Sequence, residues 1–383
     1  MTLRLSFVLG MWAALGAQAQ SGRFQINTST PEGVLLQQAG QETDEARQIA
    51  LYEEFLAKYP KHEGVVYAWS HVQPLLLKAK MYDKVIAAAE VVVAAEPDNP
   101  VAAYNGLQAC EQKGDAACII QWSERTVEAA KKKLSSKKPE DEAEADTWTR
   151  QIDYARQVIT RCEYAFYAGA LKFTDPKSIA GLYESLEKMN PESQYIAPAG
   201  ARYFVALLQM KDTAKAQAFA EKVAEAGRAN EDMLLFAADA NLSTTKDYDK
   251  AARYAAKIAE TLPSQAAPQG MAAADWEAKK SATIARAWWI QGTALGVKED
   301  WAKCDKALRA GLPAIEASAA SKDLLPGAYF YLGLANYNLS KVKAKRDAAR
   351  AADARKYFTA CSKFPGPFQT PAVKNLQAMA SGK

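Results

Sequence analysis

The sequence has few of the residues on which metal and acid–base chemistry depend. Its 383 residues include two histidines and five cysteines, and the cysteines form no CxxC pair or zinc-type spacing. His62 and His71 alone offer little from which to build a metal site or a histidine-based catalytic centre. The motifs GxSxG, HExxH, GxxxxGK and GxGxxG are absent as well. We therefore expect a chain that is not an enzyme and has no catalytic residues, bound metal or cofactor.

An excess of one charge is also lacking. The chain carries 48 Lys and Arg against 44 Asp and Glu, a net charge of +4, which argues against a dedicated nucleic-acid binder. Hydrophobic residues make up 49% of the chain, which excludes a disordered polyelectrolyte. β-branched runs between turn residues are almost absent, whereas alanine, the best helix former, is abundant. The composition therefore predicts an all-helical protein.

The N-terminal segment resembles an export signal. Arg4 gives a short positive region, Leu5 to Leu15 an apolar core, and Ala17-Gln18-Ala19 a cleavage site with small residues at both ends. A membrane anchor is the alternative, but the apolar core is shorter than the roughly 20 residues that cross a bilayer. No later stretch is apolar enough to span a membrane. We expect 1–19 to be a signal peptide of an exported protein, periplasmic or secreted, with an N-terminal extension over 20–43.

An internal repeat organises the rest of the chain. Val66 to Asn99 and Pro100 to Lys133 align without gaps, and their central turns, at Lys80 and Gly114, lie 34 residues apart. Further turns recur at Lys211-Asp212, Lys246-Asp247-Tyr248-Asp249 and Glu299-Asp300-Trp301. A period of this size, two amphipathic helices and two turns, is typical of a helical solenoid.

The repeat resembles the tetratricopeptide repeat (TPR) family. Its pattern is matched by Trp69 and Pro97, by Trp288, Gly292 and Leu295, and by Tyr329, Gly333, Phe358 and Pro365; the piece Leu51 to Pro60 is similar to exported bacterial members. The resemblance implies a right-handed all-α solenoid of about eight helix–turn–helix repeats over 44–383, closed by a capping helix at Pro371 to Ala380. We expect insertions near 131–145, 264–274 and 341–352.

The resemblance also implies a binding face. In the family, the first helices of successive repeats line a concave groove, and the fifth position of the repeat faces it. Here that position is occupied by Ser70, Tyr104, Tyr164, Ala201, Phe236, Trp289 and Phe330, with Arg161, Arg202 and Arg286 beside it. Aromatic and arginine side chains are the usual anchors of protein interfaces. Either this stripe grips a peptide, or its aromatics pack against neighbouring first helices and meet no ligand.

Two smaller features leave alternatives open. Cys110 and Cys118 flank a predicted turn, and they either form a disulfide or lie as separate thiols in the core. Lys341, Lys343, Lys345, Arg346 and Arg350 crowd a helix-prone stretch. This stretch is either a weak attachment site for an anionic surface or a solvated helix face.

Three functions fit these observations. The first is an exported, non-catalytic scaffold or adaptor that binds a peptide or protein partner in the concave groove. The second is a structural component of an envelope assembly, which would use the convex face or the ends. The third is a glycan-binding or enzymatic site built by the inserted loops, with Trp276 near 264–274; it requires exposed aromatics in that loop.

Overall fold

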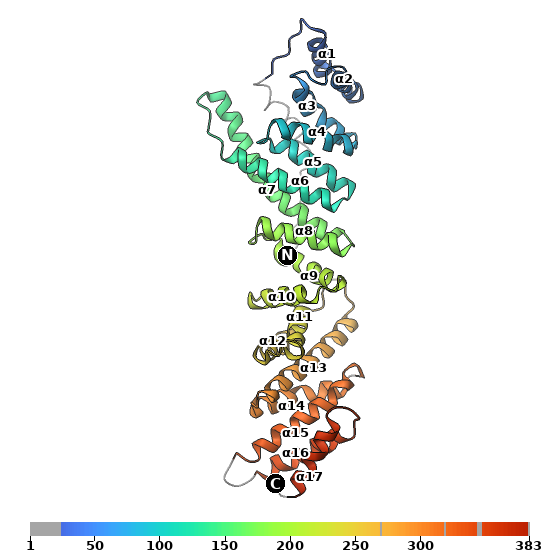
Figure 1. Ribbon diagram of the computed structural model, residues 1–383, viewed down its shortest axis with the longest axis vertical. Helices are drawn as coiled ribbons and strands as arrows, with labels where there is room; N and C mark the ends of the chain where they lie inside the picture. Colours follow the sequence, from blue (N-terminus) through green and yellow to red (C-terminus); the bar gives the residue numbers. More distant parts are fainter. Residues whose placement is uncertain (1–23, 269, 318, 343–346, 382–383) are drawn as a thin grey trace. The chain divides into compact units, whose positions relative to one another are not determined.

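The computed structural model describes residues 24–268, 270–317, 319–342 and 347–381. All regular elements in these ranges are helices, seventeen α-helices and two short 3-10 helices (Figure 1). The expected signal peptide at 1–19 lies outside the described residues. The chain forms two compact units that divide between Met210 and Lys211.

The first unit contains nine α-helices. They are α1 (Pro31–Gln41), α2 (Glu45–Lys58), α3 (Val65–Lys78), α4 (Tyr82–Ala95), α5 (Pro100–Lys113), α6 (Ala116–Leu134), α7 (Glu142–Lys172), α8 (Pro176–Met189) and α9 (Ile196–Gln209). The second unit contains α10 (Thr213–Glu225), α11 (Glu231–Ser243), α12 (Tyr248–Thr261), α13 (Ala273–Val297), α14 (Trp301–Ala317), α15 (Leu325–Leu339), α16 (Ala348–Ser362) and α17 (Gln369–Ala380).

The helix order confirms the predicted all-α solenoid. The first unit contains four successive pairs, α1–α2 to α7–α8, and then α9. The second unit contains α10, the three pairs α11–α12 to α15–α16, and α17, which packs on α15 and α16 at the predicted cap. In each pair we call the odd-numbered helix the first helix and the even-numbered one the second. Within the first unit α3 contacts α5, α5 contacts α7 and α7 contacts α9; within the second α11 contacts α13 and α13 contacts α15. First helices therefore form one continuous layer in each unit.

A recurring turn explains why the chain reverses where the sequence indicated. One to three residues after the end of the first helix, a residue adopts a left-handed conformation, with φ between 57° and 68° at Lys80, Gly114, Lys246 and Glu299. In three of these turns an aspartate follows at once and caps the second helix: Asp115 accepts from Cys118 N, Asp247 from Lys250 N and Asp300 from Lys303 N. The left-handed residue stops one helix and the aspartate starts the next, so the pair is encoded locally.

Close packing inside a pair depends on glycine at some positions. A Cβ added at Gly292 on α13 would lie 2.3 Å from Leu308 Cγ on α14, and one at Gly333 on α15 would lie 2.5 Å from Phe358 on α16. Both glycines belong to the TPR-like pattern. Their missing side chains let the two helices of a pair approach each other.

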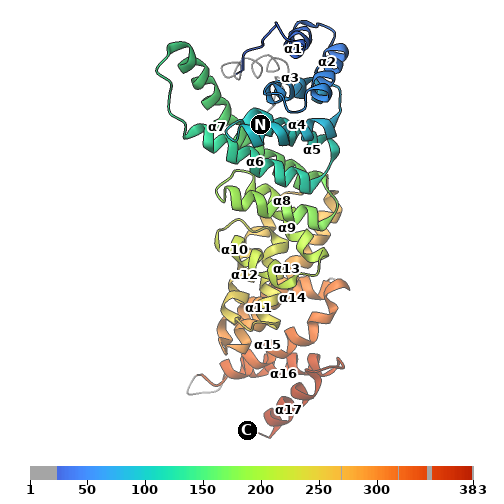
Figure 2. The same cartoon turned by 45° about the horizontal axis from the view of Figure 1, so that its top comes forward.

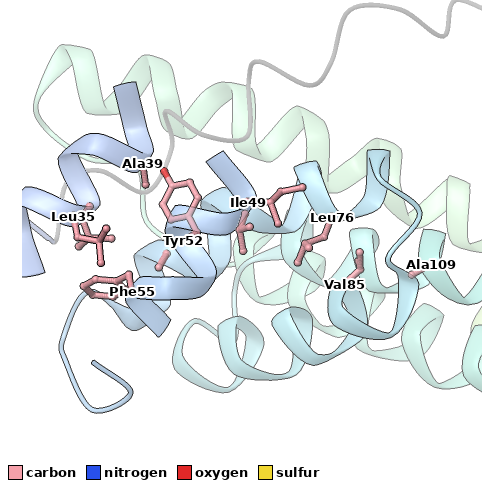
Figure 3. Packing of buried hydrophobic residues seen from close by; sticks show 11 residues of the cluster. Leu35, Ala39, Ile49, Tyr52, Phe55, Leu76, Val85 and Ala109 are labelled. Carbon is pink, nitrogen blue, oxygen red and sulfur yellow. The ribbon is translucent and has the colours of Figure 1, made fainter. Parts of the chain in front are cut away.

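The segment expected to be an N-terminal extension, 20–43, contains helix α1. Thr30 caps this helix, Pro31 occupies its first turn, and Leu35 and Ala39 pack against Tyr52 of α2 (Figure 3). The turn before α2 lacks the left-handed residue of the later repeats, which is why the repeat pattern did not include it. The first repeat therefore begins at Pro31.

The solenoid expected over 44–383 contains the boundary between the two compact units. Each repeat of a solenoid contacts only its neighbours, so an array can divide at any interface between repeats.

The insertions near 131–145 and 264–274 are loops shortened by the helices on either side of them. Helix α6 continues to Leu134 and α7 already starts at Glu142, so only a short loop remains in the first. The N-terminal half of α7 projects beyond the neighbouring helices of its unit (Figures 1 and 2). In the second, a 3-10 turn at Leu262–Ser264 precedes α13, and only 265–272 form a loop.

Candidate functional site: the first-helix face

The first unit presents a face built by α5, α7 and α9. On α7 the residues Arg161, Tyr164 and Leu171 recur at helical spacing, and on α9 Tyr195, Arg202 and Val205 do the same. Tyr164, Leu171 and Val205 have 39%, 44% and 45% of their surface exposed. Large exposed apolar side chains are uncommon in so small an area, and they mark candidate contact sites.

At one edge of this face Arg161 links α7 to α5. Its Nε donates to the hydroxyl of Tyr104 over 3.2 Å, and its guanidinium lies 5.5 Å from the ring centre of Tyr164. Tyr104 is half-buried against Tyr154, and burial raises the pKa of its hydroxyl against the opposing effect of Arg161. Arg161 thus fixes the rim of the face, while Tyr164 stays accessible.

Three tyrosines form the centre of the face. The ring of Tyr167 stacks on Tyr195 with centres 5.1 Å apart, and Tyr164 meets Tyr195 edge to face at 5.8 Å. Tyr195 is the N-cap residue of α9, so the cluster joins α7 to the start of α9. Mutual packing holds these rings in place, so a ligand would meet preorganised aromatic surface.

Arg202 lies at the other end of the face. Its Nη2 donates to the carbonyl of Phe173, the C-cap residue of α7, over 2.8 Å. Its Nε is buried and has no hydrogen-bond partner among the described residues. The side chain borders a cavity of about 200 Å³ lined by Thr174, Ile179, Arg202, Val205, Ala206 and Gln209.

The predicted stripe differs in the second unit. Arg286 on α13 donates to Asp239 on α11 over 2.8 Å and lies over the ring of Trp289, so its charge is neutralised within the unit. Lys279 likewise bridges Glu231 and Asp232. Phe236 is half-buried on α11. On the face that α11 and α13 share, the cationic side chains of α13 are therefore paired with carboxylates of α11.

Phe330 is half-buried against the core cluster near the C-terminus. It packs on Phe358 and Phe368 with ring centres 6.1 and 5.2 Å away, inside the cluster that α17 closes. Of the expected stripe, the structure brings together Tyr104, Arg161 and Tyr164, and it places Tyr195 and Tyr167 beside them. These last two tyrosines are not predicted by the repeat pattern, because they lie outside its fifth position.

A glutamate that recurs at the same position of several second helices is also not predicted by the repeat pattern. In five second helices the residue nine positions after the N-cap is Glu, and each accepts from a later helix of its own unit. These residues are Glu53, Glu90, Glu124, Glu184 and Glu221, bonded to Lys84, Arg125, Lys188, Tyr203 and Lys250. The signal that could reveal it is a fixed offset from the capping residue. In each case the glutamate links its helix to a later helix of the same unit.

The remaining candidate residues fall in other places. Cys110 and Cys118 are joined by a disulfide that bridges α5 and α6, and Cys162, Cys304 and Cys361 are buried thiols. Trp276, which a glycan site in the 264–274 loop would need at the surface, lies in α13 with 2% of its surface exposed, and its Nε1 donates to Gln265 O. Burial of this ring removes the aromatic platform on which that alternative depended.

The expected basic helix near 341–352 is only partly correct. Lys343, Lys345 and Arg346 lie outside the described residues, and Lys341 follows α15 in a turn with its ammonium 3.7 Å from the ring centre of Tyr337. Arg350 is on α16, but it donates into a buried network with Asp305 and Asn336. Arg350 therefore does not join a basic surface.

The described residues contain no cluster of side chains that could hold a metal ion. None of the helices in this part of the chain has the length and apolar character that a membrane crossing requires.

Comparison with known proteins gives no family. No family model matches the chain, and no curated protein matches it. Among solved structures it is similar to the P58(IPK) TPR domain, with 11% sequence identity over 92% of this chain and 99% of that one, and a TM-score of 0.26. A likeness this distant shows nothing about function. The solenoid is established by the helix order and packing of this chain.

Proposed function

We propose that this chain is a non-catalytic scaffold that binds a segment of a partner protein on the first-helix face of its first unit. The observation that carries this proposal is the cluster of exposed Tyr164 with half-buried Tyr167 and Tyr195 on α7 and at the start of α9. Fixed aromatic rings give large contact area at little entropic cost, and partner helices or extended segments commonly dock on such faces. Exposed Leu171 and Val205 extend the apolar surface beyond the tyrosines.

The face of the second unit supports the proposal by contrast. There Arg286 and Lys279 are matched by carboxylates of α11, and Phe330 is packed under the cap. In the first unit, among the described residues, neither Arg161 nor Arg202 forms an ion pair. Guanidinium groups without an ion-pair partner in their own chain can pair with a binding partner, whereas those already paired within the chain cannot.

Selection of binding peptides from a random library tests the proposal. Residues 20–383 serve as the bait for a phage library of random 12-residue peptides, and the best peptides are synthesised and titrated by fluorescence anisotropy. Tyr164→Ser should weaken binding by about tenfold or more, since central aromatic anchors contribute about 2 kcal/mol or more. The matched control is Val91→Ser, which changes a side chain 36% exposed on the second helix α4.

The outcomes separate the two faces. Loss of affinity with Tyr164→Ser and not with Val91→Ser supports the first-helix face. Equal affinity of both variants and the wild type places binding elsewhere, and loss with Val91→Ser alone moves it to the second-helix face that an assembly component would use. Failure to select any peptide contradicts the proposal. Circular dichroism must show equal helicity for all proteins.

We also propose that the chain is exported. The apolar pattern at 1–19 and the Cys110–Cys118 disulfide support this, because disulfides persist in oxidising compartments. Expression with the full N-terminus, followed by fractionation and intact mass measurement, should yield a chain that starts at Gln20. A chain that retains Met1 in the cytoplasm would contradict export.

A further inference from the structure

The unsatisfied guanidinium of Arg202 indicates what kind of segment this face binds. Arginine carries five N–H donors and stays charged at all relevant pH values. In Arg202 only Nη2 has a hydrogen-bond partner among the described residues, the carbonyl of Phe173, and no carboxylate lies within ion-pair distance. Buried donors are normally satisfied, so the unpartnered Nε shows that the chain itself does not complete the hydrogen bonding of Arg202, a side chain that borders a cavity able to admit an acceptor.

The cavity beside Arg202 suits a short acidic side chain. Arg202 supplies the charge and Thr174 and Gln209 supply neutral polar groups, while Ile179, Val205 and Ala206 form an apolar wall. The lining contains no acidic residue. An apolar wall suits the two methylene groups of a glutamate side chain, and the charge of Arg202 suits its carboxylate.

Spacing along α9 connects this cavity to the tyrosine cluster. Tyr195 and Arg202 are seven residues apart on one helix face, which corresponds to about 10 Å along the axis. An extended chain covers about 10 Å in three residues. The floor between them consists of Pro198 and Ala201, two small exposed residues over which a backbone can pass.

We propose that the cavity at Arg202 receives the carboxylate of a glutamate side chain, in a bound segment that places an apolar residue on the tyrosine cluster three positions away. This inference rests on the proposed function, since it names the chemistry of the partner at the same face. Arg161 adds a second positive charge near the tyrosines. Glu111 on α5 partly offsets it, and burial raises the pKa of that carboxyl group.

A purely structural role for Arg202 is the competing explanation. Its bond to Phe173 O satisfies a carbonyl at the C-terminal end of α7, where a positive charge is also favourable. That role uses one of five donors and does not require a cavity beside Nε. It predicts that Arg202 affects stability alone, whereas the proposal predicts an effect that depends on the ligand.

The test uses the selected peptides and their Glu→Gln versions on residues 20–383. For the wild type, Glu→Gln at the position three residues from the apolar anchor should lower affinity by about 10- to 100-fold, as expected for a charged hydrogen bond. Arg202→Gln should bind both versions equally. Arg286→Gln is the control, since that arginine already has Asp239 as its partner.

A second variant is needed because Arg202→Gln also removes the hydrogen bond to Phe173 O and could disturb the fold. Val205→Glu changes an exposed residue of the cavity wall and supplies an internal carboxylate for Arg202. It should weaken the Glu peptide more than the Gln peptide and so abolish the difference between them, with α7 still capped. Peptides with an amidated C-terminus distinguish a side-chain carboxylate from a terminal one.

Each outcome decides between the alternatives. Discrimination between Glu and Gln that disappears in both variants supports the proposal. Selected peptides that need Tyr164 but ignore Glu→Gln, or that respond only to amidation, overturn this inference and leave the proposed function standing. Peptides insensitive to Tyr164→Ser overturn the proposed function itself.

Discussion

Arg350 on α16 donates to Asp305 Oδ2 on α14 at 2.5 Å, which ties two successive second helices together across α15. Asn336 of α15 completes the link, because its Nδ2 donates to Asp305 Oδ1 at 2.7 Å and its Oδ1 accepts from Arg350. Arg309 adds a bond to the same carboxylate and a second one to Asp353. Asp305 is 5% exposed, so these bonds form in a largely dry site.

Removal of Asp305 should strongly destabilise the second unit. Asp305→Ala leaves Arg350 without its carboxylate partner and Arg309 with Asp353 alone. Because both guanidinium groups are partly exposed, the unfolding free energy should fall by about 2 kcal/mol, less than for a fully buried ion pair. Urea unfolding followed by circular dichroism measures this change. Glu260→Ala, an exposed position on α12, is the control and should stay within about 0.5 kcal/mol. A loss below about 1 kcal/mol for Asp305→Ala would show that the network contributes little.

Glu221 should make the second unit sensitive to acid. Burial raises the pKa of this carboxyl group, but hydrogen bonds from Lys250, Gln217 and Asn241 outweigh burial, so the pKa lies below its ordinary value of 4.5. A depressed pKa gives stability that is present above the unfolded value and lost as pH falls through the folded value.

Wild-type stability should therefore fall on acidification below about pH 4.5, and Glu221→Gln should lose less over the same range. Urea midpoints at about pH 6, 4.5 and 3.5 give the comparison. Parallel pH profiles of the two proteins would exclude a contribution from Glu221.

The Cys110–Cys118 disulfide should stabilise the first unit modestly. The cysteines are 8 residues apart, and closure of so short a loop accounts for about 2.5 kcal/mol in the chain-entropy model. Cys118→Ser should lower the unfolding free energy by about that amount. Alkylation under native, non-reducing conditions should leave Cys162, Cys304 and Cys361 unlabelled, since all three are buried. Labelling of all the cysteines in the unfolded, unreduced protein would contradict the disulfide.

Glycine substitution at a left-handed turn should stabilise the second unit. Glu299 adopts a φ of 61°, a conformation that costs a residue with a side chain about 1 kcal/mol relative to glycine. Glu299→Gly should raise the unfolding free energy by about that amount. Lys306→Gly, at an exposed position inside α14, should lower it by about 1 kcal/mol. Destabilisation by both changes would contradict the role assigned to the turn.

Local signals in the sequence are sufficient to predict the helix pairs. The turns at Gly114, Lys246 and Glu299 appear as short patterns, because a left-handed residue followed by a capping aspartate acts within four residues. Helix α1 is not predicted in this way, because its turn lacks that pattern. Its place depends on contacts with Tyr52 and Phe55, which follow it in the chain.

The binding face depends on tertiary structure. Whether Tyr164 and Phe330 are exposed depends on which helix covers them, and α17 covers Phe330 while no described element of the first unit covers Tyr164 to the same degree. Likewise Arg286 and Arg202 look alike in the sequence, but of the two only Arg286 meets a carboxylate in the described part of the chain, that of Asp239. Contacts between residues far apart in the chain decide such questions, and periodicity does not report them.

Site-specific photo-crosslinking tests most directly whether a peptide binds on the first-helix face of the first unit. Benzoylphenylalanine replaces Val205 on the first-helix face or Val91 on a second helix, two exposed valines of the first unit. Each protein is irradiated with the same selected peptide and analysed by mass spectrometry. If the peptide binds on the first-helix face, position 205 captures it and position 91 does not. Capture at position 91 alone would contradict it and place the interaction on the second-helix face.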